Sequence, residues 1–277
     1  MASAPLKPTN RLLASLPPEA LKALRPHLEP VELPLREVLF NVDVPIEHVY
    51  FPEDAVVSIL GVMPDGTAIE VATVGREGMV GLPVFLGVQR TPAHALVQVP
   101  GRGLRVRAQA FREHVQRTPG TRNALDRYTQ AMFTLVAQGA ACNRLHSIEE
   151  RCARWLLMTQ DRVGADGFPL TQQFLSQMLG VRRAGVSEVA SELQREGLLK
   201  YQRGYVSIQD RAGLEAASCE CYGVIRSEFS RLLEGQESPS PLTGVSPRFE
   251  EKGQSTAKDG TPRPRRKPGS RARSKRD

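Results

Sequence analysis

Two adjacent arginines, Arg182 and Arg183, stand in the stretch LSQMLGVRRAGVSEVASEL, which covers residues 175–193. Ser187 follows one helical turn after them, and the carboxyl group of Glu188 stands beside it. A guanidinium group donates two parallel hydrogen bonds to a guanine edge or to a phosphate, while hydroxyl and carboxylate groups suit other base edges. These residue types at this spacing therefore suit the recognition of a nucleic acid rather than bond-breaking chemistry.

Two short helices and a hairpin must position these side chains. Apolar residues recur at helical spacing on both sides of Gly180, which suits a turn that needs a positive φ. Ser176 is small at the point where the two helices would cross. Two short β-rich runs around Arg203-Gly204 then resemble a wing. The pattern predicts a winged helix-turn-helix whose second helix enters the major groove by its N-terminal end.

The predicted motif assigns roles to the exposed polar residues. Base contacts are expected from Arg182, Arg183 and Ser187, with Glu188 as a further candidate. Residues at the start of the first helix and in the hairpin are expected to contact phosphates, namely Thr171, Gln172, Gln173, Lys200 and Arg203. The alternative is a solvated pair of helices in which the arginines serve only solubility.

A long helix is predicted over residues 121–146, before the winged motif. Its apolar stripe runs through Leu125, Tyr128, Met132, Leu135, Val136, Gly139, Cys142 and Leu145 at steps of three and four. This stripe either packs on the preceding domain or pairs with its twin in a homodimer, and the length of the helix favours the homodimer. Ser147 and Glu150 then form a capping box that begins the next helix.

The N-terminal half has a β-rich pattern between Val31 and about Val106. Short runs such as EVLF, HVYF and AIEVATV alternate with turns that contain Pro, Gly and Asp, and MPDG at residues 63–66 is a hairpin turn. This spacing predicts a small antiparallel barrel or sandwich. A last helix is predicted over about 211–233.

Several of these segments resemble the Crp/Fnr family of bacterial transcription regulators over about residues 20–233. The resemblance rests on EVLFNVDVPIEHVYF, the VGREGMVG turn, HSIEERCARWLL and TQQFLSQMLGVRRAGVSEVASELQREGLL. It implies an α+β fold with an N-terminal antiparallel β-roll like a cyclic-nucleotide-binding domain, a long dimerisation helix and a C-terminal winged helix-turn-helix. The implied parts are a sensor domain at 11–120, the helix at 121–146, a DNA-binding domain at 147–234 and a disordered basic tail at 235–277.

The resemblance also implies partners and a mechanism. It implies a cytoplasmic homodimer that binds double-stranded DNA and is controlled by its sensor domain through the long helix, with RNA polymerase as a further partner if the protein activates. The family motif Glu-x-x-Ser-Arg is here Ala184, Gly185, Val186, Ser187 and Glu188, so a different half-site is expected. Glu188 is expected either to accept from a cytosine N4 amino group or to pair with an arginine such as Arg195.

An effector site would lie in the sensor domain. In family members that bind a cyclic nucleotide, a Gly-Glu turn and a later Arg-Ser/Thr hold the ligand; here Gly78, Gly81, Arg90 and Thr91 take those places. Met79 replaces the glutamate, so the contact to the ribose is absent. We therefore expect a different ligand or none rather than a cyclic nucleotide, and the sequence names no cofactor.

Composition excludes other classes of protein. The chain has 277 residues and no apolar run or leader pattern that predicts a membrane span or a secretory signal. Four cysteines in such a length favour a reducing, cytoplasmic setting, and none precedes Cys142, which argues against the family's iron–sulfur sensors. Cys219 and Cys221 alone are too few ligands to predict a metal site, and a redox-active or metal-binding pair is the alternative.

Catalysis and net charge give little further information. The sequence has no nucleophile elbow, phosphate loop or paired-histidine motif, so no enzymatic activity is expected. Most of the net charge of +7 lies in residues 235–277, either as an arm that strengthens non-specific DNA binding or as a solubilising extension. The rival function is a small-molecule sensor or adaptor that does not depend on DNA.

Overall fold

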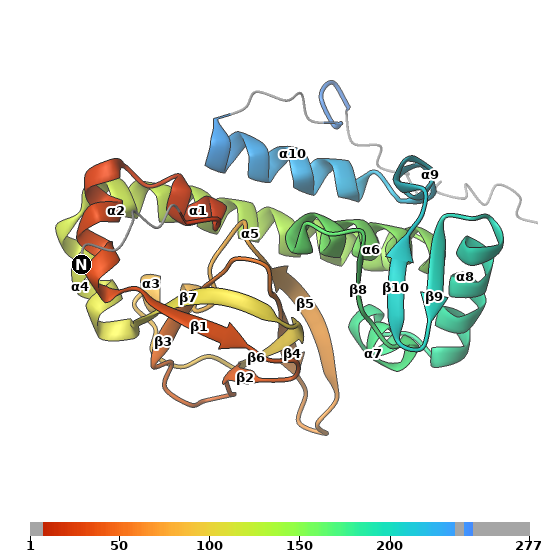
Figure 1. The fold of residues 1–277 in the computed structure, drawn as a ribbon, viewed down its shortest axis with the longest axis horizontal. Helices are drawn as coiled ribbons and strands as arrows, with labels where there is room; N and C mark the ends of the chain where they lie inside the picture. Colours follow the sequence, from red (N-terminus) through yellow and green to blue (C-terminus); the bar gives the residue numbers. More distant parts are fainter. Residues whose placement is uncertain (1–7, 236–240, 246–277) are drawn as a thin grey trace, which may run out of the picture. The chain divides into compact units, whose positions relative to one another are not determined.

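The computed structural model describes residues 8–235 and 241–245. The described residues begin with short helices and continue into an antiparallel β-roll, here called the β-roll domain (residues 8–118; Figure 1). Its helical elements before the sheets are α1 Arg11–Ala14, α2 Pro18–Leu24 and the 3₁₀ turn η1 Arg25–His27. Its strands are β1 Glu29–Leu33, β2 Val38–Phe40, β3 His48–Pro52, β4 Val56–Val62, β5 Ala68–Val74, β6 Ala93–Val99 and β7 Gly101–Arg107.

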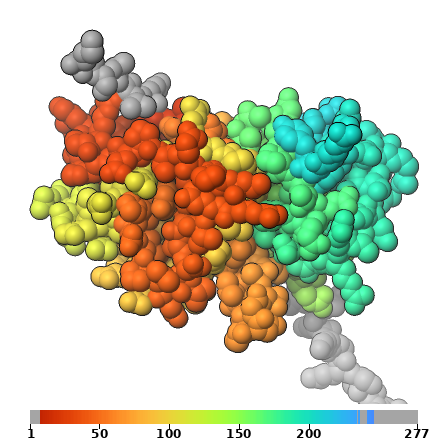
Figure 2. All heavy atoms as spheres, turned by 60° about the horizontal axis from the view of Figure 1, so that its bottom comes forward, coloured from red at the N-terminus to blue at the C-terminus, as the bar shows by residue number. Residues whose placement is uncertain are grey.

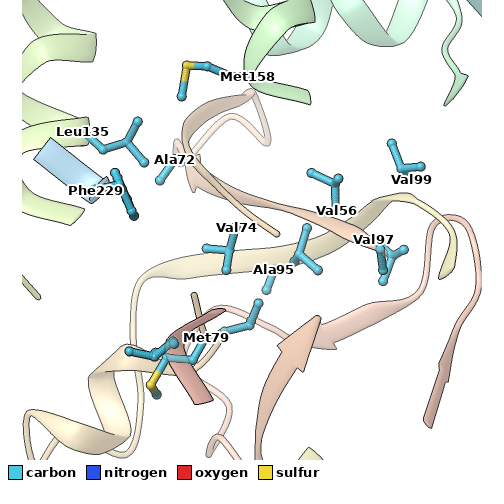
Figure 3. Packing of buried hydrophobic residues seen from close by; sticks show 14 of the residues in the cluster. Val56, Ala72, Val74, Met79, Ala95, Val97, Val99, Leu135, Met158 and Phe229 are labelled. Atoms are coloured by element: carbon cyan, nitrogen blue, oxygen red, sulfur yellow. The ribbon is translucent and has the colours of Figure 1, made fainter. Parts of the chain in front are cut away.

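The strands of the β-roll domain form two antiparallel sheets, with the orders β1-β7-β3 and β2-β6-β4-β5. The β4–β5 hairpin turns at Gly66, whose φ of 83° explains the glycine in the predicted MPDG turn. Between the sheets lies an apolar core that includes Val56, Val74, Ala95 and Val97 (Figure 3). The predicted antiparallel β-roll is therefore confirmed.

Helices close the β-roll domain. They are α3 Leu82–Phe85, α4 Ala108–Arg117 and the long α5 Pro119–Leu145. Tyr128 of α5 is fully buried, and its hydroxyl lies 3.1 Å from both the amide nitrogen and the carbonyl oxygen of Met79. A Cβ atom on Gly78 would overlap the Tyr128 ring, so this glycine is required for the close approach of the turn to α5.

The C-terminal half contains the predicted winged helix-turn-helix, here called the winged domain (residues 147–210). Helix α6 (Ile148–Val163) begins at the predicted Ser147–Glu150 capping box, and Thr171 caps α7 (Gln172–Leu179). The remaining elements are β8 Gly167–Pro169, α8 Arg183–Arg195, β9 Leu199–Gln202 and β10 Tyr205–Ile208, with the sheet order β8-β10-β9.

The predicted last helix is wrong in one respect, because the structure divides it into two. Helix α9 (Arg211–Ala217) ends at Ser218, whose extended backbone (ψ 157°) interrupts the helix before α10 (Cys221–Glu234). Helix α10 then lies along α5 (Figure 1), where the rings of Phe229 and Tyr128 pack edge to face. The predicted disordered tail falls, apart from 235 and 241–245, outside the described residues.

The winged domain packs directly on the β-roll domain. Arg162 of α6 forms an ion pair of 2.8 Å with Glu77, and both side chains are more than nine-tenths buried. Trp155 Nε1, also on α6, donates a 2.8 Å hydrogen bond to Glu70 Oε1 on β5. In Figure 2 the red-to-yellow β-roll domain and the green-to-cyan winged domain form one continuous surface. Neither contact was predicted from the sequence.

The apolar stripe of α5 packs largely against its own chain. Leu125, Tyr128, Leu135 and Cys142 are buried there. Two members of the predicted stripe, Val136 and Leu145, remain exposed on α5, and so does Phe133 beside them. None of the helices in the described part of the chain is long and apolar enough to span a membrane.

Candidate nucleic-acid interface

The two arginines stand at the N-terminal end of α8. Arg182 is the N-cap and Arg183 the first helical residue, and both side chains are exposed. The preceding turn is set by Gly180, whose φ of 64° ends α7, while the Val181 amide donates to the Ser176 carbonyl at 3.0 Å. The helix terminus adds a partial positive charge to that of the guanidinium groups, so this end of α8 suits an anion.

Ser187 joins the two helices of the motif. Its hydroxyl donates to Gln172 Oε1 at 2.7 Å and lies 3.1 Å from the Arg183 carbonyl oxygen. A predicted base-contacting residue and a predicted phosphate-contacting residue are thus hydrogen-bonded to each other. The bond fixes the first turn of α7 against the second turn of α8, which orients the surface that carries the arginines.

Glu188 of α8 does not pair with Arg195, which was one of its two expected roles. Arg195 forms its ion pair with Glu192, at 2.9 Å, so it is not the partner of Glu188. Glu188 is exposed, and no salt bridge of Glu188 is found among the described residues. Its carboxylate is therefore accessible on the same helix as Arg183.

The wing brings further predicted contacts to the same surface. Arg203 and Gly204 have φ values of 50° and 77°, which is the backbone of a type I′ hairpin turn. The Leu170 amide donates to the Gly204 carbonyl at 2.8 Å, so the wing tip lies beside Thr171 at the start of α7. Other predicted phosphate contacts, Gln173 and Lys200, are exposed.

A second candidate site lies in the β-roll domain, against α5. It is an apolar cavity of about 330 Å³ whose walls include Ile59, Met79, Met132, Phe133 and Val136. Met79 is buried in the core at the position where the glutamate was expected (Figure 3). The cavity therefore suits an apolar ligand better than a charged one.

The four predicted effector residues are only partly brought together. Gly81 and Thr91 line the cavity. Gly78 packs under Tyr128, and the Arg90 guanidinium donates to the Asp43 carbonyl oxygen at 2.8 Å on the exposed rim. Arg90 is not among the residues that line the cavity.

Comparison with known families matches both halves of this architecture. Residues 30–118 match the cyclic nucleotide-binding domain, and residues 150–217 match the Crp-like helix-turn-helix domain. The chain belongs to the Crp/Fnr family. Members of this family are transcription regulators, which agrees with the arginines and the wing on the winged domain.

Solved structures share the fold of this Crp/Fnr protein. FixK2 from Bradyrhizobium japonicum is 17% identical with a TM-score of 0.60, over 69% of this chain and 98% of FixK2. The c-di-GMP-responsive regulator CLP from Xanthomonas campestris is 17% identical with a TM-score of 0.55, over 69% of this chain and 98% of CLP. No curated protein matches the sequence.

The residues that join the two domains of this Crp/Fnr protein were not predicted from its sequence. Burial, only partly offset by hydrogen bonds from Ser58 and Trp155, raises the pKa of Glu70 to about 7. At the same boundary between the two domains, the negative charge of the Glu77 carboxylate neutralises the positive charge of the Arg162 guanidinium. One signal in the sequence was the spacing of Trp155 and Arg162, which are seven residues apart and lie on one face of α6. The partner of each residue, Glu70 and Glu77, is 85 residues away in the sequence, so the spacing did not identify the contacts.

Proposed function

We propose that this Crp/Fnr protein is a homodimeric, sequence-specific DNA-binding regulator whose β-roll domain controls DNA binding through α5. Arg182 and Arg183 read or clamp the major groove, Ser187 and Glu188 contribute to base selection, and Thr171, Gln172, Gln173, Lys200 and Arg203 bind phosphates. The single observation that supports this most is the exposed arginine pair at the start of α8, beside the wing tip.

The surface has the chemistry that DNA requires. Arg183 and Arg203 supply cations from two elements, and neither is in an ion pair among the described residues. The backbone amides at the N-terminal turn of α8 add a partial positive charge next to Arg183. The Ser187–Gln172 hydrogen bond orders the two polar side chains before binding, which lowers the entropy cost of contact.

The exposed side of α5 supports a dimer. Phe133 has 69% of its surface exposed, and Val136 is exposed one turn later. Gly139 and Ala140 follow these residues on the helix, so a second helix can approach closely. A second copy of α5 would cover the apolar side chains that the monomer leaves in water.

The cavity links ligand binding to that dimer. Met132, Phe133 and Val136 are at once walls of the apolar cavity and residues of α5. A ligand that fills the cavity contacts the helix at the proposed dimer interface, so it favours one arrangement of α5 over another. The two winged domains would then change their spacing on DNA.

Selection of DNA fragments by the purified protein, at a stated salt concentration, tests the proposal. A two-fold symmetric site should be enriched, and light scattering should give twice the mass of one chain. Failure to enrich any sequence, with the domain still folded, would favour the rival adaptor function. The same selection with Arg182→Ala and Arg183→Ala combined should lose the enrichment.

A further inference from the structure

Three cysteines and one histidine meet where α5, α6 and α10 come together. The residues are Cys142, His146, Cys219 and Cys221, and their ligand atoms all lie within 4.8 Å of one another. The Sγ atoms of Cys142 and Cys219 are 3.5 Å apart, and Cys221 Sγ is 3.5 Å from His146 Nδ1. The three cysteines are free thiols that are almost fully buried.

Local structure brings the four groups together from two segments. Cys142 and His146 are one helical turn apart, at the end of α5, so both face the same side. Cys219 and Cys221 follow the extended Ser218, with Glu220 between them as the N-cap of α10. The break between α9 and α10 therefore directs both thiols toward the end of α5.

The distances fit a tetrahedral ion of a particular size. Zinc lies about 2.3 Å from a thiolate sulfur and about 2.0–2.1 Å from a histidine nitrogen. Ligands around such an ion stand roughly 3.5–3.8 Å apart, which is the tetrahedral edge that follows from those bond lengths. The two measured separations of 3.5 Å agree with this, and so does the Cys₃His composition of structural zinc sites.

The surrounding groups complete the site. Glu220 lies 3.3 Å from His146 Nε2, so its carboxylate can hold the ring with Nδ1 directed toward the sulfur atoms. Gln138 donates to Cys221 Sγ at 3.1 Å. A histidine held by a carboxylate through its other nitrogen is the usual outer arrangement of a metal ligand.

Two buried cations supply the opposite charge. Arg151 and Arg154 on α6 are each about nine-tenths buried and interact electrostatically with Cys142. Neither forms a salt bridge within the described ranges, and the Nε atom of each lacks a hydrogen-bond partner there. Three thiolates around Zn²⁺ carry a net charge of −1, which offsets two buried cations that, among the described residues, donate to neutral acceptors, the Leu179 carbonyl oxygen and Met158 Sδ.

We propose that Cys142, His146, Cys219 and Cys221 bind one Zn²⁺ ion, which fastens the start of α10 to the end of α5. The three thiols release their protons on binding, and no oxidant or reductant takes part. The site does not depend on the proposed function, because it lies outside the arginine surface and the apolar cavity.

Metal analysis of the full chain, purified under reducing conditions, tests the proposal. We expect about one zinc per chain, and a more than tenfold lower content in Cys219→Ser and Cys221→Ser. Cys152→Ser is the matched control, because Cys152 is equally buried but lies outside the cluster. A chain that binds no zinc even with excess Zn²⁺ and intact thiols, or that holds iron with labile sulfide, would overturn the proposal.

Cobalt gives a second measurement, which is made first on the wild-type chain. Co²⁺ added to the metal-free wild-type chain should give intense visible bands of tetrahedral geometry and sulfur-to-cobalt charge-transfer bands, which equimolar Zn²⁺ removes. His146→Gln should change the visible bands while the charge-transfer bands remain. Weak octahedral bands alone, or a Cys142–Cys219 disulfide in the chain isolated without oxidant, would contradict the zinc site.

Discussion

Trp155 Nε1 donates a hydrogen bond to Glu70 Oε1 at 2.8 Å, so α6 of the winged domain is joined to β5 of the β-roll domain. The same carboxyl group accepts from Ser58 at 2.7 Å. These bonds hold Glu70 at the boundary between the two domains. Its ionisation therefore concerns both stability and the coupling of the two domains.

The folded protein should lose stability as pH rises through neutrality because of Glu70. Burial raises the pKa of Glu70 to about 7 from an unfolded value of 4.5, so the folded state binds more protons between those pH values. Stability falls over that window. Between pH 5 and 8, the free energy of unfolding measured in urea should fall by about 1–3 kcal/mol less in Glu70→Gln than in the wild-type chain. This figure allows for the partial exposure of Glu70.

Glu188→Gln is the control for that experiment. Like Glu70→Gln it removes one carboxyl group, but from an exposed position. Its pH profile should follow that of the wild-type chain. An unchanged slope in Glu70→Gln would show that the Glu70 carboxyl titrates normally.

Removal of one partner from the Glu77–Arg162 pair should destabilise the chain strongly. Glu77→Gln leaves a guanidinium buried at 6% exposure with carbonyl partners only, and such a loss costs about 3–5 kcal/mol. Glu192→Gln breaks the exposed pair with Arg195 and should cost less than about 1 kcal/mol. Equal losses in denaturant unfolding would mean that burial does not control the energetics of these pairs.

Replacement of Arg183 by Ala should weaken operator binding by about 1–3 kcal/mol and relax selectivity at one base pair. The reason is the loss of a bidentate donor at the end of α8. Arg195→Ala removes an arginine from the far end of the same helix and should leave base preference intact. Competition binding with single-base variants of the selected site measures both; uniform weakening across all sites would assign Arg183 to phosphate instead.

Phe133→Lys should convert the proposed dimer to a monomer. A charge at this exposed position of α5 would have to be buried against the second copy, at a cost that exceeds the few kcal/mol of an apolar contact. Leu35→Lys, at another exposed apolar residue, should leave the mass unchanged. Sedimentation velocity separates the outcomes, and a Phe133→Lys dimer would place the interface elsewhere.

Local patterns predicted most of the fold. Ser147 with Glu150, Gly180 and Arg203-Gly204 carry information in their immediate neighbours, since caps and turns are decided within a few residues. Strands of the β-roll domain were predictable for the same reason. The division of the last helix at Ser218 was not, because serine is tolerated in helices and the packing of α10 on α5 is a contact between distant parts of the chain.

The candidate sites were predictable only where they are local. The arginine surface follows from α7, α8 and the wing, which are consecutive in the chain. By contrast, Cys142 and Cys219 are 77 residues apart, and Glu77 and Arg162 are 85 apart. No spacing rule joins such residues, since their approach depends on how α10 and α6 pack.

Helix α10 has a consequence for how this chain can be divided into fragments. The match to the Crp-like helix-turn-helix domain ends at residue 217, before α10 begins. Yet Arg127 Nε on α5 donates to the Leu232 carbonyl at 2.9 Å, and Phe229 packs on Tyr128. A fragment that ends at residue 217 would lack α10, so the face of α5 that α10 covers would be exposed. A fragment that kept α10 without α5 would expose the apolar face of α10 to water. Expression of the DNA-binding half alone should therefore yield an aggregation-prone product, whichever of these boundaries is chosen.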